Sequence, residues 1–176
     1  TISKGLSLVE HDVARGMDAR WALVAYGGND SDFDWAGIAA DPEGDHRPRT
    51  ELPEFLSKLK QTVTELARVG VQPVLMSLPP IDPRRYLRFI CRNGLDRNAI
   101  MRWLGDEDMI YRHQELYSDA VAALAMTEGL PLIDVRRQFL PMRDLPRYIA
   151  ADGIHLTMTG YRCLFDTLAG WIRERL

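Results

Sequence analysis

The sequence is poor in cysteine, has no long apolar run and carries no excess of one charge. Its two cysteines, Cys91 and Cys163, lie far apart and fit no metal-binding spacing, which predicts two buried free thiols. No apolar run approaches the roughly 20 residues that a membrane-spanning helix needs. The net charge is −3, and both signs are mixed along the chain. This balance gives no electrostatic basis for binding nucleic acid.

What remains is the composition of a folded globular protein. Apolar residues make up 46% of the chain and charged residues 27%. A chain of 176 residues has the size of one ordinary domain with a sizeable core. The sequence therefore predicts a single soluble domain over residues 1–176. It opens at Thr1 without an initiator Met or signal-peptide pattern, as though cut from something longer, so a cytoplasmic and a secreted location both stay open.

Apolar residues alternate between short continuous runs and helical stripes. Residues 21–26, 71–78 and 130–135 are short apolar runs typical of buried strands. Helical spacing predicts long helices at residues 6–17, 52–67, 110–125 and 160–176, and a short one at 99–104. We expect a loop at residues 29–50 and an otherwise irregular stretch at 81–108. Strands that alternate with helices predict an α/β fold with a parallel sheet covered on both faces.

One candidate site is the pair Asp152 and His155, three residues apart just before the last predicted helix. Gly153 between them permits a tight turn, in which the carboxylate can fold back to accept a proton from the imidazole. Such a pair fixes the tautomer of the histidine and stabilises the imidazolium that forms when it takes a proton from a hydroxyl. The alternative is structural: Asp152 caps a turn, and His155 is a packed or surface histidine.

A second candidate site is Gly27-Gly28-Asn29-Asp30, which follows the first predicted strand. Ligands of parallel α/β sheets bind at this carboxyl end of the strands. Glycines there let the backbone approach a substrate closely, and the Asn29 amide can donate to a developing oxyanion. One such donor contributes about 3–4 kcal/mol in acyl-transfer enzymes. The alternative is that Asn29 and Asp30 are turn residues only.

Together the two motifs resemble blocks III and V of the SGNH (GDSL-type) ester hydrolases, in the same order and with matching strands and helices between them. The resemblance implies a flavodoxin-like three-layer α/β/α sandwich with a parallel sheet, whose first strands are missing from this sequence. It also implies a role for each residue. His155 is the general base, Asp152 orients it and Asn29 donates to the oxyanion, with Gly28 and Asp30 at the substrate.

The same family requires a Gly-Asp-Ser block that carries the nucleophile, and a second glycine whose N–H completes the oxyanion hole. We expect the nucleophile upstream of Thr1, in a missing N-terminal segment of the same protein or in a separate piece, and the second glycine just before Thr1 or at Gly5. Without the strand that this segment supplies, the strand at residues 21–26 would expose an unpaired edge. Ser77, at the end of the second predicted strand, is the best internal candidate for the nucleophile.

These features predict a serine ester hydrolase that works through an acyl-enzyme and needs no metal or organic cofactor. Its substrate would be a small-molecule, carbohydrate or lipid ester, and family membership alone does not identify which one. Two alternatives stay open. One is a catalytically silent fragment or binding module of the same fold. The other is a metal- or phosphate-dependent protein using Asp30, Asp32 and Asp34, which alternate as in a calcium-binding loop.

A cluster of arginines follows the second predicted strand and allows two readings: Arg84, Arg85, Arg88 and Arg92. In the first, the cluster is a lid that offers bidentate donors to a carboxylate or phosphate of the substrate. In the second, it is a solvated helix face whose arginines pair with nearby acids.

Overall fold

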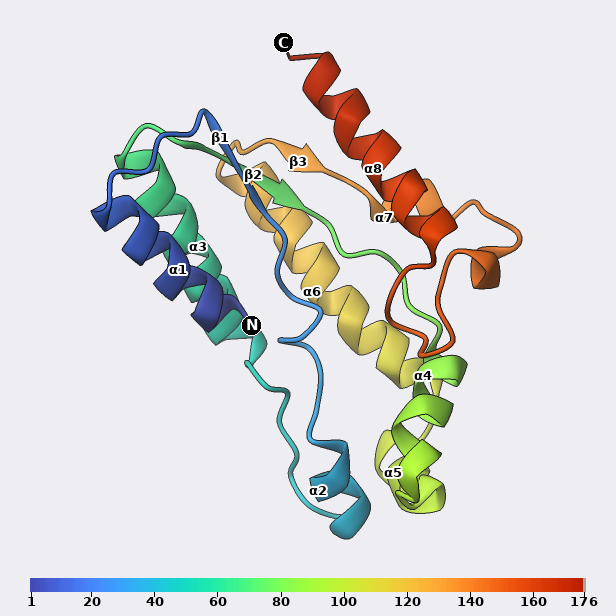
Figure 1. Cartoon of the computed structure of the whole chain (residues 1–176). Coiled ribbons are helices and arrows are strands. Elements are labelled where there is room, and N and C mark those ends of the chain that lie inside the picture. The colour runs from blue at the N-terminus through green and yellow to red at the C-terminus, as the bar shows by residue number, and fades with distance from the viewer. Residues whose placement is uncertain (176) are drawn as a thin grey trace. The chain divides into compact units, whose positions relative to one another are not determined.

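The computed structural model (Figure 1) describes residues 1–175. These residues group into two compact units. The first unit contains Thr1–Asp32, Arg47–Leu78 and Leu116–Asp134. The second contains Phe33–His46, Pro79–Glu115 and the residues from Val135 onward. The predicted single domain over residues 1–176 stays a prediction.

The first unit is built on a parallel three-stranded sheet of order β1-β2-β3. Its strands are β1 (Trp21–Val24), β2 (Gln72–Met76) and β3 (Leu132–Ile133). Val24 pairs with Leu75, and Met76 pairs with Ile133. Neighbouring parallel strands need a long crossover connection. Helix α3 (Leu52–Arg68) lies in the connection from β1 to β2, and α6 (Asp108–Thr127) lies in the connection from β2 to β3.

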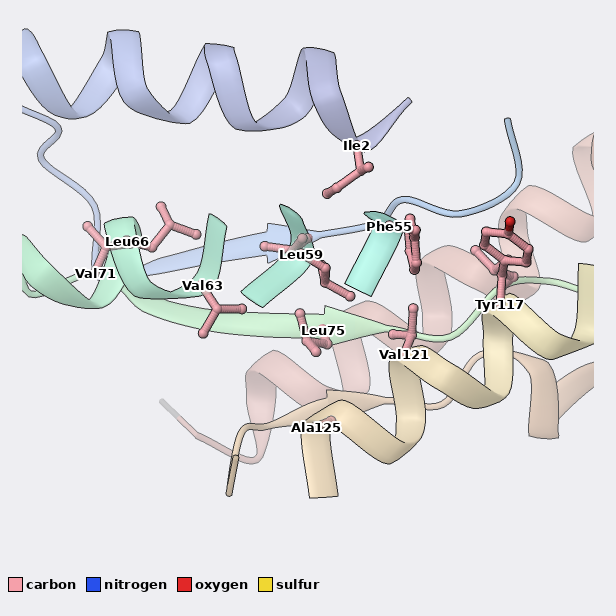
Figure 2. Packing of buried hydrophobic residues seen from close by; sticks show 12 residues of the cluster. Ile2, Phe55, Leu59, Val63, Leu66, Val71, Leu75, Tyr117, Val121 and Ala125 are labelled. Atoms are coloured by element: carbon pink, nitrogen blue, oxygen red, sulfur yellow. The ribbon is translucent and has the colours of Figure 1, made fainter. Parts of the chain in front are cut away.

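The core of the first unit lies between the sheet and these helices (Figure 2). Helix α3 presents a stripe of buried residues at helical spacing: Phe55, Leu59, Val63 and Leu66. It packs with Val24 and Leu75 of the sheet, and Ile2 of α1 (Ile2–Ala14) joins the same cluster. Each fully buried side chain of this size contributes roughly 1.5–3 kcal/mol. Helix α1 packs along α3.

A buried carboxylate fixes the turn that follows β1. Asp30 is fully buried and accepts the backbone N–H of Ile2 at 2.9 and 3.1 Å and the hydroxyl of Thr50 at 2.8 Å. These bonds compensate for the removal of the charge from water. The carboxylate thereby ties the start of α1 and the segment before α3 to the turn that contains Asn29.

The second unit has a core rich in aromatic side chains. Phe33 packs edge-on against Trp35 and Trp103, and the Trp35 indole N–H donates to the Tyr86 hydroxyl at 3.2 Å. These residues lie in or beside α2 (Trp35–Ala40), α4 (Pro83–Ile90) and α5 (Arg97–Leu104). The remaining elements of this unit are short turns and one long helix: η1 (Cys91–Asn93), α7 (Arg136–Phe139), η2 (Leu145–Arg147) and α8 (Met158–Arg173).

Within residues 1–175 the long predicted helices and the three strands are confirmed, with shorter strands than expected. The predicted end of the last helix, at Leu176, lies outside the described residues. The prediction of loops at residues 29–50 and 81–108 was wrong in part, because α2 and α4 form there. Each begins at an aspartate whose side chain accepts the N–H three residues later, Asp34 for α2 and Asp82 for α4. Pro83 then occupies the first turn of α4, where no intrahelical N–H is required.

The exposure of the first strand and of the two cysteines can be compared with the sequence predictions. Strand β1 is the end strand of the sheet formed by residues 1–175, and Leu23 on it is 46% exposed. Cys91 and Cys163 are free thiols, as expected, but both are partly exposed rather than buried. Among residues 1–175, no helix has the length and apolar character needed to cross a membrane.

Tyr117 makes the stability of the first unit sensitive to alkaline pH. Its side chain is 1% exposed, and its hydroxyl donates to the Thr50 carbonyl at 2.6 Å. Burial, then the negative charges of Asp30 and Glu51, raise the pKa of Tyr117 from 10.0 to about 12. The folded state therefore holds this proton more tightly than the unfolded state. The resulting stability is complete below pH 10.0 and is lost as the pH rises through about 12.

We expect Tyr117→Phe to lose stability less steeply than the wild type in this alkaline range, because no phenol is left at this position to ionise on unfolding. At neutral pH the variant should be less stable by about 1 kcal/mol, since the Thr50 carbonyl loses its donor. Urea denaturation across the pH series measures both effects. Tyr161→Phe, at an exposed tyrosine, is the control, and equal slopes for the two variants would contradict the prediction.

Candidate active site

Asp152 and His155 meet in a tight turn just before α8. The imidazole Nδ1 of His155 lies 2.6 Å from Oδ2 of Asp152. The other carboxylate oxygen, Oδ1, accepts the backbone N–H of His155 at 3.0 Å and that of Ile154 at 3.1 Å. Gly153 lies between them with φ +84°, a left-handed conformation that favours glycine. The turn thus holds both carboxylate oxygens in place.

The environment keeps Asp152 ionised. Burial raises the pKa of its carboxyl group, but the hydrogen bonds from the imidazole and N–H of His155, the N–H of Ile154 and the charge of His155 outweigh burial. The net effect is a pKa below the ordinary value. The carboxylate can therefore accept a hydrogen bond from the Nδ1–H of His155 and stabilise an imidazolium at neutral pH.

The side chain of His155 is largely open to solvent. The His155 side chain is 65% exposed, whereas that of Asp152 is 19% exposed. With the proton on Nδ1 directed at Asp152, Nε2 keeps a lone pair that can accept a proton from a hydroxyl. This geometry is the one that a general base and its orienting carboxylate need in acyl transfer, and the catalytic roles of His155 and Asp152 stay a prediction.

A short antiparallel contact gives the His155 backbone its place. Ile149 bridges to Leu156, and the N–H of Ala150 donates to the carbonyl of His155 at 2.7 Å. The chain then enters α8, where the Thr157 side chain accepts the N–H of Gly160 at 3.2 Å. His155 is therefore held between a two-stranded contact and a capped helix.

The second motif lies in the first unit, at the carboxyl end of β1. Gly27 is buried with φ +129°, and a β-carbon there would lie 3.1 Å from a methyl carbon of Leu78. The N–H of Ser31 donates to the Gly27 carbonyl at 2.9 Å and closes the turn. Gly28 and Asn29, by contrast, are exposed. A β-carbon at Gly28 would meet no protein atom within 4 Å, so protein packing does not explain the glycine there.

Asp30 has a structural role in the first unit, because its carboxylate points inward to Ile2 and Thr50. The substrate-binding role predicted for Gly28 and Asp30 stays a prediction. The structure brings Asp152 and His155 into direct contact within the second unit. Asn29 belongs to the first unit, and its role in an oxyanion hole also stays a prediction.

The internal serine with the best position for a nucleophile is engaged elsewhere. Ser77 is 2% exposed, and its hydroxyl donates to Asp134 at 2.8 Å. Asp134 directly follows β3, so the pair joins the carboxyl ends of two neighbouring strands. Sequence reasoning missed this partner because the third strand was predicted over residues 130–135, which placed Asp134 inside the strand rather than just after its carboxyl end.

The three alternating aspartates each have a different partner. Asp30 binds Ile2 and Thr50, Asp32 lies 3.3 Å from the Arg49 guanidinium, and Asp34 caps α2. Within residues 1–175 there is no group of three or more histidine, cysteine or acidic side chains arranged to hold a metal ion.

The arginine cluster lies on α4 and η1, and two of its members pair with nearby acids, as the second reading expects. Arg84 lies 2.9 Å from Glu107, and Arg85 lies 3.3 Å from Asp82. The Arg92 guanidinium lies over the Phe89 ring, 3.5 Å from its centroid.

Two curated esterases are similar to this chain. An isoamyl acetate-hydrolyzing esterase of Saccharomyces cerevisiae is 22% identical over 172 residues, which cover 88% of this chain and 64% of that protein. A GDSL esterase/lipase of Arabidopsis thaliana is 25% identical over 158 residues, 86% of this chain and 54% of that protein. The chain therefore spans less than two thirds of the length of these relatives.

Solved structures share the fold. A lipase/acylhydrolase from Enterococcus faecalis aligns with a TM-score of 0.65 at 18% identity, over 100% of this chain and 72% of that one. A GDSL-like lipase from Bacteroides thetaiotaomicron gives 0.65 at 16% identity, with the same coverage. The α/β fold predicted from the sequence is confirmed. Residues 4–163 match the model of one protein family, and since this is well over half of the chain, the protein belongs to the GDSL-like lipase/acylhydrolase family.

Proposed function

We propose that the protein is a serine ester hydrolase that works through an acyl-enzyme. The observation that carries the proposal is the 2.6 Å contact between His155 Nδ1 and Asp152 Oδ2, in a chain of this family. It leaves Nε2 of an exposed histidine as the base. The name of the yeast relative makes an acetate ester of a small alcohol the first substrate to test.

In the proposed reaction a serine hydroxyl attacks the ester carbonyl while Nε2 of His155 takes its proton. The carbonyl oxygen becomes an oxyanion, and the side-chain amide of Asn29 donates to it. His155 then passes its proton to the departing alcohol oxygen as the C–O bond breaks. Water repeats the sequence on the acyl-enzyme, with His155 again as the base, and releases the acid and the serine.

We further propose that the nucleophilic serine lies outside residues 1–176. The hydroxyls of Ser77, just after β2, and Ser118, on α6, are already hydrogen-bonded within the protein. Ser77 donates to Asp134, and Ser118 accepts the N–H of Leu78 at 3.1 Å. Both are 2% exposed, so an ester carbonyl has little access to either hydroxyl.

Fluorophosphonate labelling of the natural full-length protein, with peptide mapping, tests the reaction class. We expect one labelled serine, outside residues 1–176, because only an activated serine reacts with this probe. A label on Ser77 would keep the reaction class and overturn the proposed nucleophile. A protein that takes no label and cleaves no acetate ester would instead be a binding module or catalytically silent member of the family.

Replacement of the histidine and its partner should reduce turnover strongly in protein that takes the label. We expect His155→Ala to lower kcat by about 10⁴-fold or more, and Asp152→Asn by about 10³- to 10⁴-fold, because the base or its correct tautomer is lost. Steady-state hydrolysis of an acetate ester measures both. His11→Ala and Asp144→Asn, at exposed positions, are the controls. Wild-type turnover in His155→Ala would remove the histidine from the mechanism.

Asn29→Ala should act on the chemical step. Loss of one oxyanion donor predicts a decrease in kcat of about 10²- to 10³-fold with little change in KM, because the donor binds the transition state more strongly than the substrate. Asn98→Ala, at an exposed asparagine on α5, is the matched control. An unchanged kcat in Asn29→Ala would show that this amide does not stabilise the oxyanion.

A further inference from the structure

The loop that contains Asp152 and His155 rests directly on the backbone of α4. The N–H of Asp82 donates to the Gly153 carbonyl at 2.8 Å. A β-carbon at Gly153 would lie 2.6 Å from the Asp82 carbonyl oxygen and would also collide with the backbone nitrogen of Tyr86. Only a glycine fits at this contact. The start of α4 therefore fixes the position of the loop at Gly153.

Arg85, on the first turn of α4, binds the other end of the same loop. Its Nη1 donates to the carbonyls of Pro146 at 2.8 Å and Ile149 at 2.6 Å. Its Nε lies 3.3 Å from Oδ2 of Asp82, whose Oδ1 accepts the Arg85 N–H at 3.0 Å. The Arg85 side chain is only 27% exposed. The guanidinium is therefore fixed by Asp82 on one side and holds two loop carbonyls on the other.

One peptide group connects Arg85 to His155. The carbonyl of Ile149 accepts from Arg85, and the N–H of the same peptide, on Ala150, donates to the His155 carbonyl at 2.7 Å. Ile149 is buried, so little water competes for these bonds. A peptide whose carbonyl accepts from a charged donor is polarised, which strengthens the bond that its N–H makes.

We propose that Arg85 is a positioning residue for His155, an inference that rests on the ester hydrolysis proposed above. Arg85 acts through the Ile149–Ala150 peptide. In this way it holds the imidazole of His155 in contact with Asp152 and in position to reach the substrate. Its Nη1 faces main-chain carbonyls of the protein, so recognition of a substrate anion by this arginine, as in a lid, is not its role here.

The expected effect follows from the geometry. Without Arg85 the Ile149–Ala150 peptide loses its charged partner, and the segment that hydrogen-bonds to the His155 backbone is free to shift. A displacement of about 1 Å at a catalytic group lowers turnover by up to about 100-fold. Because Arg85 does not contact the substrate, KM should change by less than about twofold while kcat falls by about 10- to 100-fold.

The test compares Arg85→Met with Arg84→Met in the natural full-length protein. Both remove a guanidinium from the same turn of α4, but the Arg84 side chain is 71% exposed and pairs with Glu107. We expect the kcat loss only in Arg85→Met. Amide hydrogen exchange gives a second measurement that needs no activity. Exchange at Ala150 should become at least about tenfold faster in Arg85→Met, whereas the amide of Ile100 in α5 should stay protected.

Equal kcat and equal Ala150 exchange in the two variants would overturn the proposal. So would faster exchange at Ile100 and Ala150 alike, because that pattern shows general destabilisation. If Arg85→Met does not fold, Arg85→Lys replaces it, and a smaller kcat loss with intermediate exchange at Ala150 is expected, since one ammonium retains the charge without the planar fork. If the wild type cleaves no ester, the proposed function fails, and the exchange comparison alone decides whether Arg85 holds the loop.

Discussion

Parallel strand pairing is the constraint on which the first unit depends. Because β1, β2 and β3 run in one direction, their carboxyl ends meet at one edge of the sheet, and each connection has to return through a helix. The turn with Gly28 and Asn29 follows β1, Ser77 follows β2 and Asp134 follows β3. The hydrogen bond from Ser77 to Asp134 is direct evidence that residues far apart in the sequence converge there.

In the second unit, the main constraint is the position of His155, which lies on a loop. Loops are usually more variable in position than helices and strands. Here the loop has two backbone contacts. Gly153 contacts the start of α4, and Ile149 bridges to Leu156 at the end of the loop. Asp152 and His155 lie within only four consecutive residues. The arginine that binds their loop, Arg85, lies on a helix more than sixty residues earlier in the chain.

Sequence reasoning succeeded where the signal is local or periodic. Long apolar stripes predicted α3 and α6, and the spacing of Asp152 and His155 predicted their contact. It failed where a short helix begins through a capping aspartate, as at α2 and α4. The inward direction of Asp30 was equally invisible, because its partners Ile2 and Thr50 are 28 and 20 residues away and one of them is a backbone N–H. Side-chain patterns cannot reveal such a partner.

The crowding at Gly153 bears on attempts to change what this protein accepts. A mutant library around His155 would naturally randomise the whole turn, but any side chain at Gly153 forces the loop away from the Asp82 carbonyl. Clones with a side chain at residue 153 would therefore lose the position of His155 together with the glycine. Ala151, one residue before Asp152, is exposed, so a larger side chain there can extend into solvent. Diversity in this turn therefore belongs at residue 151, with residue 153 held constant.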